Sequence, residues 1–289
     1  WLKNNTKNDW EKELNSCNFI YISHNHPDHL HPQTLDKIDK EIPIVVPNFI
    51  SDSTGKYIDS LGFKNIFRFN LGKEYKMTNS NLYLSILKSG DFREDSGIYF
   101  SNGNLTCLFD VDSNIINFNK LPNVDIYASS FAGGASGYPL MFDNYKIEEK
   151  KKILKKEMSM IKNFTINSIK KIKPKYFIPY ASYFEEKLDR DKEIKRLNKK
   201  NNILDYKSLT KKLNIEVLDI PKYDSFEFKN KKLINCENIK RPLYKDLKPK
   251  QYLDYYKKNY DSIDYDYIQK YFKSSKFKDN LILIITLAD

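Results

Sequence analysis

Short apolar runs separated by polar turns occupy most of the first 180 residues, and this pattern is typical of β-strands. The runs that we predict to be strands are 19–22, 44–46, 65–69, 81–87, 97–100, 105–109, 124–128 and 176–178. Ser101-Asn102-Gly103-Asn104 joins two of these runs and has the composition of a tight hairpin turn. The first part of the chain is therefore expected to be rich in β-sheet.

Helical periodicity marks three further segments. Residues 52–61 and 204–213 are two of these predicted helices. Residues 226–234, by contrast, are predicted to form a small hairpin. Residues 146–172 form the longest helical pattern, and their many lysines are expected to face solvent. The face of this helix that we expect to pack on the sheet carries Ile153, Met160, Phe164 and Ile169.

The amino-acid composition of the chain changes near residue 240. Tyr- and Lys-rich helical segments follow, and the chain closes on the apolar run 281–287, which is expected to pair as a strand. We therefore predict one domain over 1–239 and the start of a second, C-terminal module over 240–289. Because the chain begins with Trp1 rather than Met, we expect it to be a segment of a longer protein whose first strands are missing.

The chain of 289 residues is basic, with 49 Lys and Arg against 38 Asp and Glu, which gives a net charge of +11. Such a balance can indicate an anionic partner. Lys, Asn and Ile are frequent throughout, however, and no aromatic-basic motif of a nucleic-acid-binding module is present. We therefore predict no nucleic-acid partner.

Cysteine usage and hydropathy bear on location. Cys17, Cys107 and Cys236 are isolated and odd in number, so a disulfide framework is not expected and a reducing compartment is favoured. No apolar run reaches membrane-spanning length, and no signal peptide is visible. These observations predict a cytoplasmic protein that does not interact with membranes.

The most informative chemistry lies in residues 19–31, where a short apolar run precedes a polar stretch that holds all four histidines of the chain. Imidazole and carboxylate groups are ligands that zinc, iron and manganese accept. His24 and His26, two positions apart, can share one metal ion, whereas Asp28 and His29 lie further round the turn. A polar surface loop is the alternative, but the complete His-x-His-x-Asp-His spacing favours a metal site.

This spacing resembles the signature of the metallo-β-lactamase superfamily. The resemblance implies an α/β fold with four layers, in which two mixed sheets lie between helices (αββα) and the metal ions bind at one sheet edge. In this chain, the four-layered domain would be followed by a truncated C-terminal α/β extension.

The superfamily pattern requires three further ligands: a histidine, a bridging aspartate and a late histidine. No histidine follows His31, so the resemblance leaves Asp91 for the first of these positions and Asp112 for the bridging position. The late position contains no good ligand. An alternative role, the capping of turns and strand ends, applies to Asp91, Asp95 and Asp110.

The predicted cofactor is a divalent metal, iron or zinc. A first site would consist of His24, His26 and Asp91, and two histidines with one carboxylate suit non-haem iron. A second site of Asp28, His29 and Asp112 is poorer in ligands, so one ion is favoured over two. Asp28 is also the candidate catalytic residue, because it can orient or deprotonate a metal-bound water.

A glycine-rich segment, Ala128 to Phe142, follows the predicted strand 124–128. Three glycines in five positions allow backbone N–H groups to turn towards an anion. A phosphate or sugar-nucleotide cradle and a plain tight loop are both compatible with this composition. The spacing matches neither a Walker motif nor a dinucleotide-binding motif.

Three stretches together narrow the resemblance: Tyr21 to Leu30, Phe131 to Pro139 and Pro179 to Phe184. They are similar to the CMP-N-acetylneuraminate hydroxylase (monooxygenase) family. The resemblance implies a nucleotide-linked sugar as substrate, with the binding residues Phe131, Gly133, Gly134, Ser136, Gly137 and Tyr180. The family usually carries a Rieske domain, but no Cys-x-His or Cys-x-x-His ligands occur here, so we expect no Fe–S cluster of the chain's own and an external Rieske or reductase electron donor.

Three functions remain open at this point. The first is an oxygenase component that hydroxylates an N-acetyl group of a nucleotide-linked sugar. The second is a metallohydrolase of a phosphoester, lactone or amide, as is common in the superfamily. The third is a non-catalytic sugar-nucleotide-binding module that keeps the fold and a vestigial site.

Overall fold

The structure is a computed structural model of the 289-residue chain. It describes residues 10–113, 116, 121–132, 138–181, 191–220, 223, 225–238, 248, 250, 251, 254 and 265–274. The chain divides into two compact units, Trp1–Tyr244 and Lys245–Asp289. In the second unit, the structure describes helix α8 (Tyr265–Ser274), whereas the predicted strand 281–287 lies outside the described residues.

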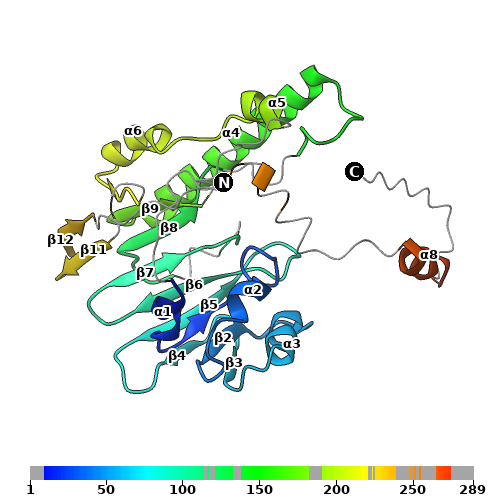
Figure 1. The fold of residues 1–289 in the computed structure, drawn as a ribbon. Helices are drawn as coiled ribbons and strands as arrows, with labels where there is room; N and C mark the ends of the chain where they lie inside the picture. Colours follow the sequence, from blue (N-terminus) through cyan, green and yellow to red (C-terminus); the bar gives the residue numbers. More distant parts are fainter. Residues whose placement is uncertain are drawn as a thin grey trace. The chain divides into compact units, whose positions relative to one another are not determined.

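The larger sheet of the first unit has seven strands in the order β10-β9-β8-β7-β6-β5-β4 (Figure 1). In chain order they are β4 (Glu74–Lys76), β5 (Tyr83–Lys88), β6 (Ser96–Ser101), β7 (Thr106–Phe109), β8 (Ile126–Ser130), β9 (Tyr176–Tyr180) and β10 (Glu216–Val217). Strands β4 to β7 pair antiparallel, and β7 to β10 pair parallel. The sequence patterns predicted the five long strands, whereas the short edge strands β4 and β10 were not foreseen.

The smaller sheet contains three parallel strands, β1 (Ile20–Tyr21), β2 (Ile44–Pro47) and β3 (Ile66–Phe69). The helices packed against it are α1 (Trp10–Asn15), α2 (Pro32–Leu35) and α3 (Ser53–Ser60). In β2, Ile44 and Val46 face the core shared with these helices, whereas Val45 belongs to the core shared with the larger sheet. Side chains of a strand alternate between its two faces, so a run that is apolar at every position fits a strand buried on both sides.

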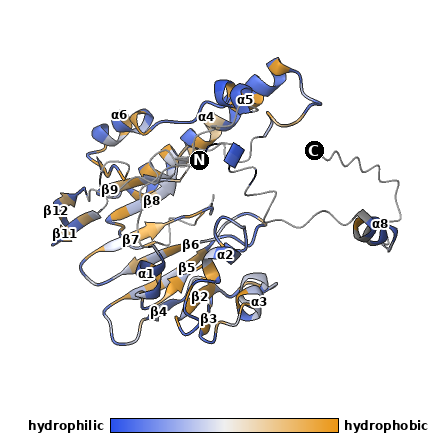
Figure 2. Cartoon of the chain, in the orientation of Figure 1, coloured by the Kyte–Doolittle hydropathy of each residue, from blue (hydrophilic) through white to orange (hydrophobic). Residues whose placement is uncertain are grey.

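On the opposite face of the larger sheet, α4 (Ile147–Ile172) and α6 (Leu204–Lys212) share a core with the strands through Leu108, Tyr127, Ile169, Phe177 and Tyr206. Helix α5 (Lys192–Leu197) lies between these two helices in sequence. Hydrophobic residues concentrate in the strands, and hydrophilic ones mark the outer surfaces of α4 and α6 (Figure 2).

The buried face of α4 differs from the predicted one. Ile169 is buried as expected, but Met160 is 59% exposed, and the buried positions are Leu154, Thr165, Ser168 and Ile169. The stripe is rotated because small polar residues also face the sheet, and Thr165 satisfies its hydroxyl within the helix by donating to the carbonyl of Ile161 (3.0 Å). A pattern based on large apolar residues alone does not identify such positions.

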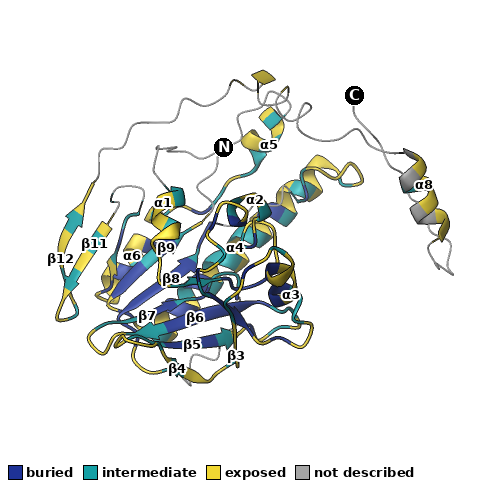
Figure 3. Ribbon diagram, turned by 60° about the horizontal axis from the view of Figure 1, so that its bottom comes forward, coloured by how far each residue is buried: buried dark blue, intermediate teal, exposed yellow. Residues whose placement is uncertain are grey.

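The predicted hairpin is present as β11 (Ser225–Lys229) and β12 (Lys232–Glu237). Its residues Phe226, Phe228 and Leu233 pack against Tyr176 and Ile126 of the larger sheet. The first unit thus contains helices, a sheet, a second sheet and helices in successive layers, and its central strands are largely buried (Figure 3). The predicted α/β fold with two sheets between helices is confirmed. Among the described helices, none is long and apolar enough to cross a lipid bilayer.

Candidate metal centre

Several strands end at one edge of the two sheets. Strand β6 runs antiparallel to β7, so the residues that precede β6 lie at the same edge as the residues that follow β7. Strands β8 and β9 are parallel to β7 and also end there. The hydroxyl of Ser96 joins the two sheets at this edge, because it donates to the carbonyl of Ser23 (2.8 Å) and lies 2.7 Å from the hydroxyl of Tyr21.

The loop after β1 carries the histidine motif. Ile22, Ser23 and His24 are buried, whereas the chain from Asn25 to Asp28 is exposed. The amides of His29 and Leu30 both donate to the carbonyl of His26 (2.9 and 2.8 Å), which closes one tight turn. This turn returns His29 to the side of His24, and the centroids of their rings lie 4.3 Å apart.

His24 lies at the centre of the site and is 1% exposed. Its Nδ1 atom lies 2.9 Å from Ser23 Oγ, and its Nε2 atom lies 2.8 Å from Nδ1 of His26. The same Nε2 atom is 3.7 Å from a carboxylate oxygen of Asp95 and 3.7 Å from one of Asp112. A partner on Nδ1 fixes the orientation of the ring and presents Nε2 to the other polar groups.

Asp95 lies just before β6 and is 2% exposed. Its second carboxylate oxygen pairs with Arg93 Nη1 at 3.0 Å. Arg93 also holds Asp91, whose carboxylate accepts from Nη2 (2.7 Å) and Nε (2.9 Å) of the guanidinium. Asp91 was the predicted ligand at this position, but the structure pairs it with Arg93 and brings Asp95 to His24 instead.

Asp112 follows β7 and lies between two histidines. One of its carboxylate oxygens is 3.4 Å from Nε2 of His29 and 3.7 Å from Nε2 of His24. Asp28, the candidate catalytic residue, is 3.6 Å from His29 Nε2, and its side chain is 78% exposed. The fourth histidine, His31, lies outside this cluster and pairs with Thr34 through its Nδ1 atom (2.8 Å).

The electrostatics of the cluster differ from one histidine to the next. Burial, followed by repulsion from His29, lowers the pKa of His24, so this ring is neutral at neutral pH. The hydrogen bond to Asp112 raises the pKa of His29, and the same interaction lowers the pKa of Asp112. A divalent metal requires neutral imidazoles and ionised carboxylates. His24 and Asp112 therefore suit a metal as they stand, whereas the raised pKa of His29 favours a proton that a metal would have to displace.

Two groups of three ligand atoms could hold a metal ion among the described residues. They are His24, His26 and Asp95, and His24, His29 and Asp112, each with ligand atoms within 4.8 Å of one another. Both sets contain two imidazoles and one carboxylate, which suits non-haem iron and zinc. His24 belongs to both groups, so they compete for one imidazole, and this geometry fits one ion better than two.

Behind Asp112 lies a buried carboxyl group, Asp110, which is 2% exposed. It accepts hydrogen bonds from Tyr127 (2.6 Å), Ser129 (2.7 Å) and Tyr180 (3.5 Å). Burial raises the pKa of Asp110 to about 7. Val111, between the two aspartates, has a left-handed backbone with φ of 53°, which is costly for a β-branched residue. Asp110 on one side of it is buried, whereas Asp112 on the other side faces His24 and His29.

The predicted substrate residues lie partly in the described structure. Tyr180 ends β9 beside Asp110, so its hydroxyl is engaged in that buried network. Phe131 is buried just after β8, and its carbonyl accepts from the hydroxyl of Tyr206 (2.9 Å). The loop residues Gly133, Gly134, Ser136 and Gly137 lie outside the described residues.

Sequence reasoning missed Asp95, Arg93 and the buried role of Asp110. Asp95 had been considered only for the capping of turns and strand ends, whereas Asp91 was taken as the ligand. The antiparallel pairing of β6 with β7, anticipated from the turn between them, was the available indication, because it places Asp95 and Asp112 at one edge. No comparable pattern indicated the hydroxyl groups that surround Asp110.

Comparison with known proteins identifies relatives by sequence. The chain is 33% identical over 233 residues to a cytidine monophosphate-N-acetylneuraminic acid hydroxylase from Xenopus laevis. The matched region covers 77% of this chain and 39% of the relative. The protein of the same name from Sus scrofa is 32% identical over 231 residues, covering 75% and 52% of the two chains. The resemblance to this hydroxylase family is confirmed, and the chain spans between about two fifths and about half the length of these relatives. No family model matches the chain.

Among solved structures, the chain is similar to the metallo-beta-lactamase fold protein YhfI from Bacillus subtilis, with a TM-score of 0.42 and 12% sequence identity. This similarity covers 69% of the chain and 73% of YhfI.

Proposed function

We propose that this chain is the metal-binding oxygenase part of a hydroxylase similar to the cytidine monophosphate-N-acetylneuraminic acid hydroxylases. The observation that carries the proposal is the convergence of two further histidines, His26 and His29, and two carboxylates on His24 at the sheet edge. A donor set of two imidazoles and one carboxylate leaves open positions on an iron ion. Sequence similarity to proteins named as hydroxylases favours oxidation over hydrolysis as the chemistry of this site.

In this proposal His24 and His26 hold the metal together with Asp95, and Asp112 is the second carboxylate beside His24 and His29. Bound iron would supply the activation of dioxygen for hydroxylation of an N-acetyl group. Ser23 orients His24 through Nδ1, and Arg93 holds Asp95 in place through its ion pair. These two residues are positioning residues, because they act through the ligands.

The substrate in this proposal is a nucleotide-linked sugar held beside the end of β8, where Phe131 lies in the glycine-rich segment. Hydroxylation consumes electrons that the described cysteines cannot supply through an Fe–S cluster. Cys17, Cys107 and Cys236 are all free, and Cys107 is buried in strand β7. We therefore propose a Rieske centre or reductase outside these 289 residues as the electron donor.

A metallohydrolase is the second candidate, and the position of Asp28 favours it. This carboxylate is highly exposed and lies 3.6 Å from His29 Nε2, at the open side of the cluster. Such a group can orient or deprotonate a water that a metal has activated. In this case a phosphoester, lactone or amide would be the substrate.

The experiment that separates the two combines metal analysis with turnover. Purified protein is loaded with iron under anaerobic conditions or with zinc, and is incubated with CMP-N-acetylneuraminate, dioxygen and a ferredoxin–reductase pair. A product heavier by one oxygen atom, formed with iron only and lost in His24→Ala, supports the oxygenase. Hydrolysis of a generic phosphodiester with zinc, lost in Asp28→Asn, would support the hydrolase and overturn the oxygenase.

A further inference from the structure

A tight turn carries Asp112, the carboxylate that lies beside two histidines of the candidate metal centre. The turn covers residues 110–113 and is closed by the amide of Ser113, which donates to the carbonyl of Asp110 (2.8 Å). Its second residue, Val111, has φ of 53°. A positive φ at this position of a turn favours glycine, asparagine or aspartate, and it strains a β-branched residue. Contacts around the turn must therefore keep Val111 in this conformation.

One side of the turn is anchored in the core through Asp110, which is 2% exposed. Two buried residues of β8, Tyr127 (2.6 Å) and Ser129 (2.7 Å), donate to the same oxygen of its carboxylate. The other oxygen accepts from the hydroxyl of Tyr180, at the end of β9 (3.5 Å). Burial raises the pKa of Tyr180, and a hydrogen bond from the backbone of Val111 opposes that rise. We call these three hydroxyl groups, from two neighbouring strands, the hydroxyl brace.

The other side of the turn is held by Arg93, whose Nη2 atom donates to the carbonyl of Asp112 (3.2 Å). The same guanidinium pairs with Asp95 (3.0 Å), the other carboxylate beside His24. The turn is thus attached to the core at its start and to the second candidate ligand at its third residue. Relaxation of the turn would break one of these two attachments.

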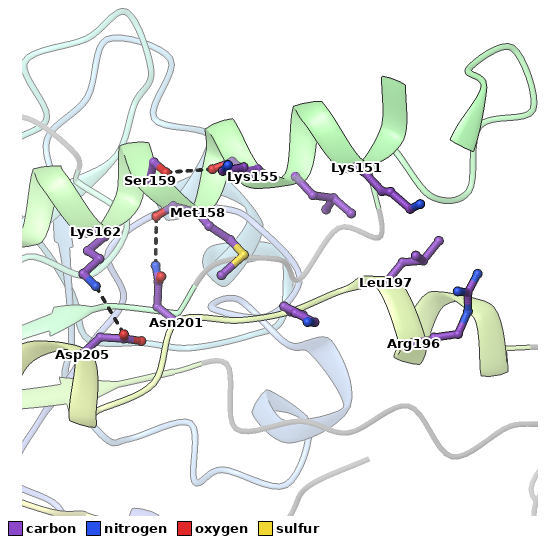
Figure 4. A pocket seen from close by; sticks show the side chains of 11 residues that line it. Lys151, Lys155, Met158, Ser159, Lys162, Arg196, Leu197, Asn201 and Asp205 are labelled. Carbon is purple, nitrogen blue, oxygen red and sulfur yellow. Dashed lines mark hydrogen bonds and ion pairs between the residues drawn. The ribbon is translucent and has the colours of Figure 1, made fainter. Parts of the chain in front are cut away.

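The strand that supplies two of the hydroxyls is itself fixed by the helical layer. Figure 4 shows Asn201 at the wall of a pocket beside α4, where its side-chain amide donates to the carbonyl of Met158 (3.1 Å). The same amide donates to the carbonyl of Phe131 (3.3 Å), which also accepts from the hydroxyl of Tyr206 (2.9 Å). Phe131 lies two residues after Ser129, so the end of β8 is held in place beside the turn.

We propose that the hydroxyl brace positions the carboxylate of Asp112 for metal binding, by keeping Val111 in its left-handed conformation. Without the brace, Val111 would relax to an ordinary backbone conformation, and the carboxylate of Asp112 would turn away from His24. The residues of the brace act through the turn, so they are positioning residues. This role rests on the metal-binding part of the proposed function, and it is the same for an oxygenase and for a hydrolase.

The test compares the zinc affinity of wild type and Tyr180→Phe by competition with a chromophoric chelator. This variant removes one hydroxyl of the brace and keeps the ring, and we expect it to weaken zinc binding by up to about tenfold, but no more than Asp112→Ala does. The matched control is Tyr176→Phe, at the other end of the same strand, which removes a hydroxyl that accepts from the amide of Leu233 (2.9 Å). It should bind zinc like wild type.

A second substitution separates positioning from general stability. Glycine adopts a positive φ without strain, so Tyr180→Phe/Val111→Gly should recover most of the affinity that Tyr180→Phe loses. A hydroxyl that only stabilised the core would give no such recovery. Cobalt(II) in place of zinc adds a spectroscopic readout, because its visible absorption depends on its ligands, and the spectrum of Tyr180→Phe should shift towards that of Asp112→Ala. If Tyr180→Phe does not fold, Ser129→Ala removes another donor of the brace and replaces it in the same comparison.

The outcomes separate this role from the proposed function. An unchanged zinc Kd in Tyr180→Phe, an equal loss in Tyr176→Phe, or a loss that Val111→Gly does not recover overturns the role of the brace and leaves the metal centre intact. A wild-type protein that binds neither zinc nor iron overturns the proposed function. Urea unfolding of the metal-free proteins then still decides whether the turn is braced, because Tyr180→Phe should cost less stability when Val111→Gly is present. Equal costs in the two backgrounds would show that the turn is not braced.

Discussion

The guanidinium of Arg93 lies 3.0 Å from the carboxylate of Asp95, and this ion pair holds a buried acid beside the histidine that is central to the candidate metal centre. The free oxygen of that carboxylate is 3.7 Å from His24 Nε2. Arg93 therefore separates two aspartates into different roles. Asp95 faces the histidines, whereas Asp91 is held by the guanidinium in an ion pair.

This relationship predicts different metal affinities for two similar variants. Asp95→Asn should weaken the binding of iron or zinc by roughly ten- to hundredfold or more, because it removes a charged ligand. Asp91→Asn is the matched control and should change the affinity less than about threefold. Both are measured by competition with a chromophoric chelator. If Asp91→Asn were the more damaging of the two, the position inferred for the carboxylate ligand would be wrong.

The pH dependence of stability should report on Asp110. Burial raises the pKa of Asp110 to about 7, from the ordinary value of 3.8 for an aspartate. Between these two values the folded protein binds more protons at this site than the unfolded chain does, so stability falls as pH rises and levels off above about pH 7. The loss amounts to roughly 4 kcal/mol at most, since each pKa unit corresponds to about 1.4 kcal/mol.

Asp110→Asn tests this contribution, because it removes the titration while its side-chain oxygen can still accept from Tyr127 or Ser129. Urea unfolding of the metal-free protein between pH 5 and pH 8 should show a flatter decline for the variant than for wild type. The exposed carboxyl of Asp36 offers a control, and Asp36→Asn should follow the wild-type curve. Parallel curves for wild type and Asp110→Asn would contradict the raised pKa.

The histidines and the carboxylates of the candidate metal centre were not equally accessible from sequence. His24, His26 and His29 could be predicted because their spacing is local, and one turn after one strand brings them together. Asp112 required only the next step, a strand followed by its first polar residues. Asp95 depends on how β6 and β7, which lie far along the chain from His24, pair with each other, so spacing in the sequence does not reveal it.

The fold shows the same division between local and tertiary information. Long buried strands such as β6 and β8 are visible as apolar runs, because burial on both faces leaves few polar positions. The short strands β4 and β10 have no such pattern, since a strand of two or three residues is specified by its neighbours. The buried face of α4 was partly misassigned for a related reason, because the sheet accepts Thr165 and Ser168 where large apolar residues were expected.

Close packing behind the site gives a further prediction at Gly97. A Cβ atom at this position would lie 2.8 Å from the carbonyl oxygen of Phe109 and 3.0 Å from Cα of Asp110. Gly97→Ala should therefore force β6 and β7 apart, at a cost of roughly 1–3 kcal/mol in the free energy of unfolding. Ser85→Ala on the neighbouring strand β5 is the control and should cost less. Denaturant unfolding measures both, and equal stabilities would show that the strands adjust freely.

The last prediction concerns Asp112, which lies 3.4 Å from His29 and 3.7 Å from His24. A metal that binds only the folded protein stabilises it by about 2.7 kcal/mol at a hundredfold excess over Kd. For a domain of this size, the increase in Tm is roughly 5–10 °C. Asp112→Ala should lose part of this increase, because it removes the second carboxylate beside His24 while His24, His26 and Asp95 remain. Asp28→Ala removes an exposed carboxylate from the same cluster and should retain the whole increase. Thermal unfolding with and without iron or zinc compares the three proteins, and a full metal-induced increase in Asp112→Ala would show that Asp112 does not contribute to metal binding.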